Sequence, residues 1–303
     1  PDKMKGLSGR EVKKVHVIAV IANYINASKV KGKLPELPLY ATKLLSLLCG
    51  IRLDSGFAAT GARPPSLVGY LGTQAEAVRD AYMTKLNDPL TNENLRVEIL
   101  RLVEKALRHQ PGLALLFINI DANKAKRGGE KDGENVQESH SCLKLVRKML
   151  ANSRHNMSSL PRLFAEVTSL LGSLWRAAPS HQSIIRALRE SPDFWKQLTE
   201  TLSVSIERHL HAYNVRQAAL NPTKAAKSPS GSEKGKERLT DDLDDEPVTV
   251  EDVCYQVTIG ANVLQILAQE VFHVDDVSDQ LDASLRDQLK LLASKEKQDK
   301  WFG

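Results

Sequence analysis

The stretch from residue 95 to residue 117 reads LRVEILRLVEKALRHQPGLALLF, and its spacing decides the fold. Apolar side chains recur every three or four residues, which places them on one face of an α-helix. Glu98 and Arg101 on the wet face are spaced to pair across one turn. Gln110-Pro-Gly112 then interrupts the helix, because proline lacks a backbone N–H, and a second apolar helix begins at Leu113. The buried stripe of the first helix is expected to comprise Leu95, Ile99, Leu102 and Ala106.

The same helical spacing recurs along most of the chain, and no segment alternates apolar and polar residues over several positions. The 42 leucines outnumber the 34 valines and isoleucines, and leucine favours helix over strand. The further stripes predicted to be buried are Val12, Val15, Ala19, Ala22 and Ile25; Leu37, Tyr40, Leu44 and Leu48; Val78, Ala81, Tyr82 and Leu86; Cys142, Val146 and Met149; Leu163, Val167, Leu170 and Leu174; Trp195, Leu198 and Leu202; Val253, Val257, Gly260, Leu264, Leu267 and Val271; and Leu281, Leu285, Leu289 and Leu292. The sequence therefore predicts an all-α fold.

Several helix ends are marked by residues that satisfy exposed backbone groups. Thr73 with Glu76, and Thr249 with Asp252, have the spacing of a capping box. Ser191-Pro-Asp193 predicts a helix start, because proline suits the first helical position and an acid is favoured there by the helix dipole.

Two polar segments divide the chain. Residues 121–137 form a charged, glycine-containing loop, and residues 221–247 a linker with three prolines and no aromatic residue. We expect residues 1–220 to form one segment of an elongated α-helical solenoid of HEAT- or armadillo-like helix pairs, and 248–303 a further helical pair of the same solenoid. Because the chain opens on Pro1 and closes directly after a helical pattern, we expect it to be a piece of a longer protein.

Composition narrows the class of protein. The net charge of +5 is too mild to indicate nucleic-acid binding, so no direct nucleic-acid partner is expected. The three scattered cysteines argue against a disulfide framework and suit a reducing compartment. The longest apolar run, residues 15–25, is about half the length that a membrane span needs.

Residues able to carry chemistry do not assemble into a site. His209 and His211 are two residues apart and point away from each other on a helix. A His140–Cys142 dyad is possible in principle, but a solvated histidine beside a core cysteine is the simpler interpretation. Residues 56–61 lack the Gly-Lys-Ser/Thr ending of a phosphate loop. We therefore expect no catalytic, cofactor-binding or metal-binding residues, no cofactor, no small-molecule substrate and no enzymatic activity.

Lys224 to Arg238 contains five cations and admits two interpretations. It could act as a bipartite nuclear-import signal or a weak nucleic-acid contact. An acidic run, residues 241–246, follows at once, so a self-neutralising linker is favoured.

Four motifs resemble the large inner-ring scaffold nucleoporins of the nuclear pore, specifically the nucleoporin 188 family, and together cover residues 67–202. They are QPGLALLFIN at 110–119, LPRL at 160–163 with LWR at 174–176, SPDFWKQLT at 191–199, and YLGTQAEAVRD at 70–80. These motifs do not distinguish the nucleoporin 188 family from its sister family, the other giant inner-ring nucleoporin. The long charged linkers resemble those of fungal members.

The resemblance implies a curved α-helical solenoid that holds linker nucleoporins in the inner ring, at the nuclear envelope. It implies other nucleoporins as partners, with transport receptors as a further class, and leaves the partner-binding residues unknown. Two alternatives stay open: a karyopherin-like or other HEAT-type adaptor outside the pore scaffold, and an all-α enzyme. Phe302-Gly303 is the one Phe-Gly dipeptide, whereas barrier-forming nucleoporins carry many.

Overall fold

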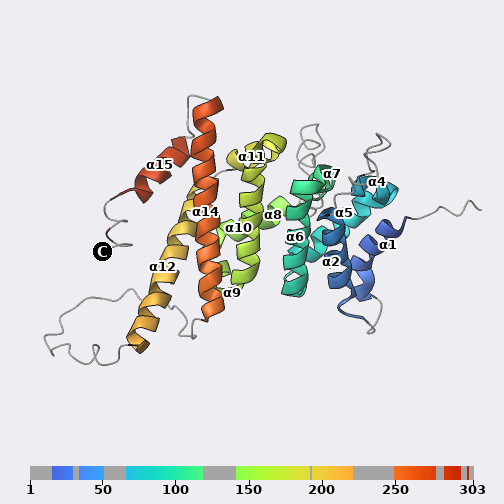
Figure 1. Ribbon diagram of the computed structural model, residues 1–303, viewed down its shortest axis with the longest axis horizontal. Helices are drawn as coiled ribbons and strands as arrows, with labels where there is room; N and C mark the ends of the chain where they lie inside the picture. Colours follow the sequence, from blue (N-terminus) through green and yellow to red (C-terminus); the bar gives the residue numbers. More distant parts are fainter. Residues whose placement is uncertain are drawn as a thin grey trace, which may run out of the picture. The chain divides into compact units, whose positions relative to one another are not determined.

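The computed structural model describes residues 16–29, 34–50, 66–118, 141–191, 193–220, 249–277, 283–294 and 299. Its elements in those ranges are all α- or 3₁₀-helices, with no strand, which confirms the all-α prediction (Figure 1). The chain divides into two compact units, Pro1–Phe117 and Ile118–Gly303. The predicted linkers 121–137 and 221–247 lie outside the described residues, as do Val12, Val15 and Leu281 of the predicted stripes. The predicted domain bounds and the HEAT or armadillo repeat type therefore stay predictions.

Unit 1 is built around α2, which packs against α6 (Figure 1). The helices of this unit are α1 (Val17–Asn23), η1 (Tyr24–Lys29), α2 (Leu37–Gly50), α4 (Leu67–Leu71), η2 (Gly72–Gln74), α5 (Ala75–Asn87), α6 (Glu93–His109) and α7 (Pro111–Ile118). Tyr82 and Phe117 are fully buried, with ring centroids 5.5 Å apart. Residues from α5 and α7 thus share one apolar core.

The stretch that predicted the fold behaves as expected except at Glu98, which was expected on the wet face and is buried. Helix α6 ends at His109 and α7 begins at Pro111. All four residues of the predicted α6 stripe are buried. Arg108 pairs with Glu104 at 2.6 Å on the opposite face, and the closest atoms of Arg101 and Glu98 lie 4.0 Å apart. The 3.6-residue period alone was sufficient to place this helix.

Unit 2 is organised by α14, which lies alongside α10 and α12 (Figure 1). Its helices are α8 (Cys142–Ala151), α9 (Ser153–Ser159), α10 (Pro161–Arg176), η6 (Ala178–Ser180), α11 (Gln182–Arg189), α12 (Phe194–Leu220), α14 (Val250–Val277) and α15 (Ala283–Leu292). The predicted stripes of α8, α10 and α12 are buried. Trp175, Phe194 and Trp195 form an aromatic cluster with ring centroids 5.0 to 6.1 Å apart. Trp301 lies outside the described residues.

The helix ends match the predictions only in part. At α14, the Thr249 N–H donates to Asp252 Oδ2 at 3.2 Å and the Asp252 N–H donates to Thr249 Oγ1 at 3.1 Å, which is the predicted reciprocal cap. The predicted box at Thr73 is wrong, because the chain there forms η2 and Gln74 stands at the start of α5 without a side-chain cap. Helix α12 begins at Phe194, later than predicted, and Asp193 before it has φ of +62°.

Candidate partner-binding faces

The residues that could carry chemistry remain separate. His209 is half-buried and His211 is exposed on α12, and within the described ranges no three potential metal ligands gather. Burial raises the pKa of the Cys142 thiol to about 12, so this thiol stays protonated and is a poor nucleophile. His140 and residues 56–61 lie outside the described residues. Across the described helices, none is long and apolar enough to cross a membrane.

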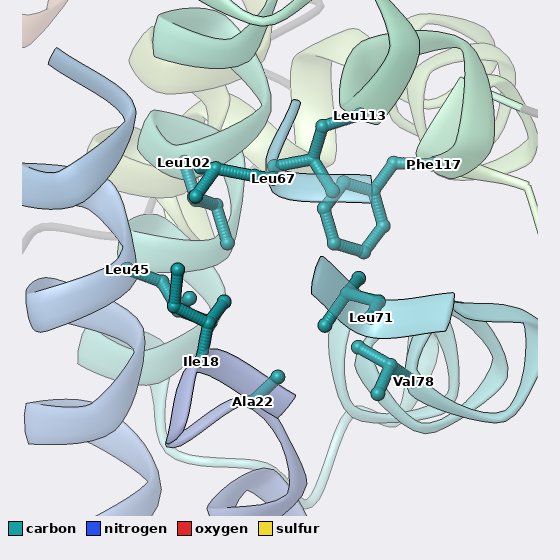
Figure 2. Close-up of a pocket in the computed structure, with 9 residues that line it drawn as sticks. All are labelled: Ile18, Ala22, Leu45, Leu67, Leu71, Val78, Leu102, Leu113 and Phe117. Carbon is teal, nitrogen blue, oxygen red and sulfur yellow. The ribbon is translucent and has the colours of Figure 1, made fainter. Parts of the chain in front are cut away.

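Unit 1 holds a small cavity that could not bind a metabolite. Its volume is about 10 Å³, close to the space of one water molecule. Figure 2 shows nine apolar side chains from six helices converging on it. They are Ile18, Ala22, Leu45, Leu67, Leu71, Val78, Leu102, Leu113 and Phe117. With no polar group in the lining, the cavity is a packing defect rather than a ligand site.

The inward face of α14 carries polar side chains that hydrogen-bond to neighbouring helices. Gln256 is buried, and its Nε2 donates to the Met157 carbonyl at 3.1 Å. The Ser205 hydroxyl of α12 donates to the backbone carbonyl of Gln256 at 2.6 Å. Asn262 Nδ2 donates to Thr168 Oγ1 of α10 at 3.2 Å. Because a buried polar group without a partner is costly, these contacts specify which face of α14 turns inward.

Glu270 makes the strongest of these contacts. Its side chain is almost fully buried, and Oε2 accepts hydrogen bonds from Trp175 Nε1 at 2.9 Å and from Arg189 Nη2 at 2.6 Å. Arg189 supplies the positive charge that a buried carboxylate needs. One carboxylate oxygen therefore joins α14 to α10 and α11.

The outward face of α14 is apolar and carries no charged residue along its centre. Val250, Val257, Leu264 and Val271 are 66%, 49%, 54% and 40% exposed. Cys254, Ala261 and Ala268, which lie between them, are exposed as well. We call these seven residues the α14 seam. Their spacings alternate between four and three residues, as in the contact line of a coiled coil.

Helix α2 also exposes large apolar side chains. Tyr40, Leu44 and Leu47 lie at helical spacing and are solvent-exposed. The buried face of this helix carries smaller or polar residues, among them Ala41, Thr42, Ser46 and Cys49, together with Leu45.

Two predicted stripes are therefore wrong in part, although Gly260 and Leu267 of the α14 stripe are buried as predicted and Leu37 and Leu48 of the α2 stripe are half-buried. Tyr40 and Leu44 were expected in the core of unit 1, and Val257, Leu264 and Val271 in the core of unit 2; all five are exposed. Both helices are apolar on two sides, so periodicity alone could not choose between the faces. The polar residues at 256, 262 and 270 were a usable indication for α14, since three polar groups on one face of an otherwise apolar helix predict hydrogen-bonding partners there.

Comparison with known proteins gives one family. The nuclear pore complex scaffold family of nucleoporins 186/192/205 matches residues 12–231. Nucleoporin NUP188 of Mus musculus is 26% identical over 289 residues, which covers 95% of this chain and 13% of that protein. The human protein of the same name gives the same identity and coverage.

NUP188 of Xenopus tropicalis is 29% identical over 188 residues, or 62% of this chain and 10% of that protein. The chain thus spans only 10 to 13% of the length of these three relatives. The curated relatives confirm the resemblance to the nucleoporin 188 family, while the likeness to fungal members stays a prediction. The match over residues 12–231 shows that the chain belongs to the nuclear pore complex scaffold family of nucleoporins 186/192/205.

Proposed function

We propose that this chain is part of a structural scaffold nucleoporin in the inner ring of the nuclear pore, where it supports transport by binding other pore components. The observation that carries the proposal is the family match over residues 12–231. The protein is non-enzymatic in this proposal, and its place is the nuclear envelope.

The exposed surfaces of the two units support a binding role. An ordered row of exposed apolar side chains is a candidate interaction site, since large exposed apolar patches often mark such sites. The row on α2 and the α14 seam are both of this kind. The cavity of unit 1, by contrast, has no polar group with which to recognise a small molecule.

The partners that fit these surfaces are linker nucleoporin segments that fold as amphipathic helices on binding. Affinity then rests on a few apolar anchors, because the net charge of +5 is small. We expect affinity to fall less than about tenfold between about 0.1 and about 0.5 M salt, since apolar contacts are not screened. A steeper loss would indicate an electrostatic mode of binding.

Localisation and co-purification in cells test the scaffold role. The tagged protein should concentrate at the nuclear rim and co-purify with inner-ring nucleoporins in amounts close to one-to-one. A diffuse nucleoplasmic distribution, with soluble cargo and a GTPase in the purified material, would support the karyopherin-like adaptor instead.

A further inference from the structure

The α14 seam has the geometry of half of a helix–helix contact. Its seven residues run from Val250 to Val271 in steps of four and three, which a second α-helix matches when the two cross at a small angle. A β-strand or an irregular segment could not match this repeat over so many turns. The spacing therefore specifies a helix as the occupant.

The size of the side chains specifies what that helix must carry. Cys254, Ala261 and Ala268 are small, and Val or Leu residues stand on either side of each of them. Small residues in a contact line leave room for large side chains from the opposite helix. The occupant therefore supplies bulky apolar residues, such as leucine or phenylalanine, at the positions facing these three.

Charge favours a basic end on the occupant but sets no direction, because α14 also carries Asp275 and Asp276 beyond the other end of the seam. No residue of the seam is charged, but Glu251 and Asp252 lie beside its N-terminal end. Both lie in the first turn of α14, where Glu251 accepts a hydrogen bond from the Tyr255 hydroxyl at 2.6 Å and Asp252 accepts one from the hydroxyl of Thr249, the residue before the helix. A helix that is basic at the end beside these carboxylates is favoured over one that is acidic there.

The area of the seam favours a short helical segment over a second copy of this chain as its occupant. The seam is about 32 Å long at 1.5 Å per residue and about 10 Å wide, which gives about 300 Å². A stable interface between two folded proteins buries about 800 Å² per partner. The seam is too small for a stable dimer of rigid copies, whereas a single helical segment needs only such a strip.

We propose that the α14 seam docks an amphipathic helical segment of another protein, about 20 residues long, with bulky apolar residues at three- and four-residue spacing and basic residues at one end. This inference rests on the proposed function, since it names the surface and the kind of segment through which the scaffold holds a partner.

The labelling rate of Cys254, a residue of the seam, can report whether the seam is occupied. Cys254 is exposed, whereas Cys49 and Cys142 are buried and burial raises the pKa of each thiol to about 12. A maleimide at neutral pH should therefore label Cys254 ahead of the two buried thiols. An occupant on the seam must slow that labelling.

The probes are two synthetic 21-residue peptides of identical composition. The matched peptide has leucines at three- and four-residue spacing and lysines at one end, and the scrambled peptide has its leucines distributed around the helix. We expect saturating matched peptide to slow Cys254 labelling by at least about tenfold, and the scrambled peptide to have little effect. Ala261→Glu should abolish protection, because a carboxylate would be buried at the contact. Tyr213→Glu, on an exposed site of α12 outside the seam, should bind as the unaltered chain does.

Four results would overturn the proposal. They are equal protection by the scrambled peptide, no protection by the matched peptide, slow Cys254 labelling in the monomeric chain without any peptide, and protection that appears only with a concentration-dependent dimer in sedimentation. Circular dichroism checks that Ala261→Glu is folded, which we expect because residue 261 is exposed. The peptides test the seam without the pore, so their failure leaves the scaffold role standing. Loss of co-purification in cells with peptide binding intact would remove the scaffold role alone.

Discussion

Helices α2 and α14 are each apolar on two sides, yet different interactions determine which face of each helix is buried. Helix α2 buries its smaller side chains, such as Ala41 and Cys49, and exposes Tyr40, Leu44 and Leu47. Helix α14 buries Gln256 and Glu270 together with apolar residues, and exposes Val257 and Leu264. Close packing orients α2, whereas specific hydrogen bonds orient α14.

The comparison teaches that total hydrophobicity does not decide which face of a two-sided helix is buried. Small side chains let α2 approach α6 closely, which gains dispersion contacts along the whole interface. On α14, Gln256, Asn262 and Glu270 each make a hydrogen bond to a neighbouring helix, so rotating the helix would leave several groups unsatisfied. The substitutions below test these two mechanisms separately.

The largest effect is expected from adjacent leucines on α2. Leu45 is buried and lines the cavity of unit 1, whereas Leu44 is exposed. Leu45→Ala should lower the free energy of unfolding by about 2–4 kcal/mol, because it removes buried methyl groups and enlarges a cavity. Leu44→Ala should change it by less than about 0.5 kcal/mol. Urea denaturation of both variants measures the difference, and equal losses would mean that α2 is rotated from the position described.

Removing the Glu270 carboxylate should be nearly as costly. Glu270→Ala leaves the buried Trp175 N–H without its acceptor, and we expect a loss of about 2–3 kcal/mol. Arg189 is partly exposed and can return to water, which limits the cost. Glu270→Gln retains an acceptor oxygen and should lose about half as much. Thermal unfolding of the two variants decides this, and a stability of Glu270→Ala equal to that of the unaltered chain would refute a structural role for the carboxylate.

Two glycines provide a smaller, matched test of close packing. A Cβ at Gly260 would lie 2.8 Å from Ser205 Oγ, whereas one at Gly172 would lie no closer than 3.6 Å to Gln265 Oε1. Gly260→Ala should therefore destabilise unit 2 by about 1–2 kcal/mol through overpacking against α12. Gly172→Ala should be neutral or stabilise by up to about 1 kcal/mol, because alanine favours the helix. If both variants gain stability, the contact between α12 and α14 is looser than described.

The smallest effect concerns the first turn of α14. Thr249→Ala removes one half of the reciprocal cap with Asp252 and should cost about 1 kcal/mol. Thr258→Ala is the control, since its hydroxyl donates to the Cys254 carbonyl one turn back on the same helix. Its effect should lie within about 0.5 kcal/mol of zero. Chemical denaturation measures both, and a Thr258 effect larger than that of Thr249 would contradict the capping role.

The sequence was sufficient for four helices, whereas of the predicted α15 stripe Leu285 is buried and Leu289 and Leu292 are half-buried. The stripes of α6, α8, α10 and α12 follow the 3.6-residue period, and their residues are buried as predicted. It failed at Tyr40, Leu44, Val257 and Leu264, because a helix with two apolar faces can be rotated without losing periodicity. The exposed rows that these errors reveal are the candidate binding faces. Which face of a helix is exposed depends on contacts between residues far apart in the chain, such as Trp175 with Glu270, and no local sequence pattern contains these contacts.

Cysteine labelling at two neighbouring positions of α14 tests most directly the claim that one face is clamped inward and the other is open for a partner. In a Cys254→Ser background, Leu264→Cys places a thiol on the seam, and Val263→Cys places one on the buried face. At about pH 8 the thiol at 264 should react with maleimide at least about a hundredfold faster than the thiol at 263, which burial keeps protonated and inaccessible. Equal rates at the two positions, or faster labelling at 263, would contradict the account.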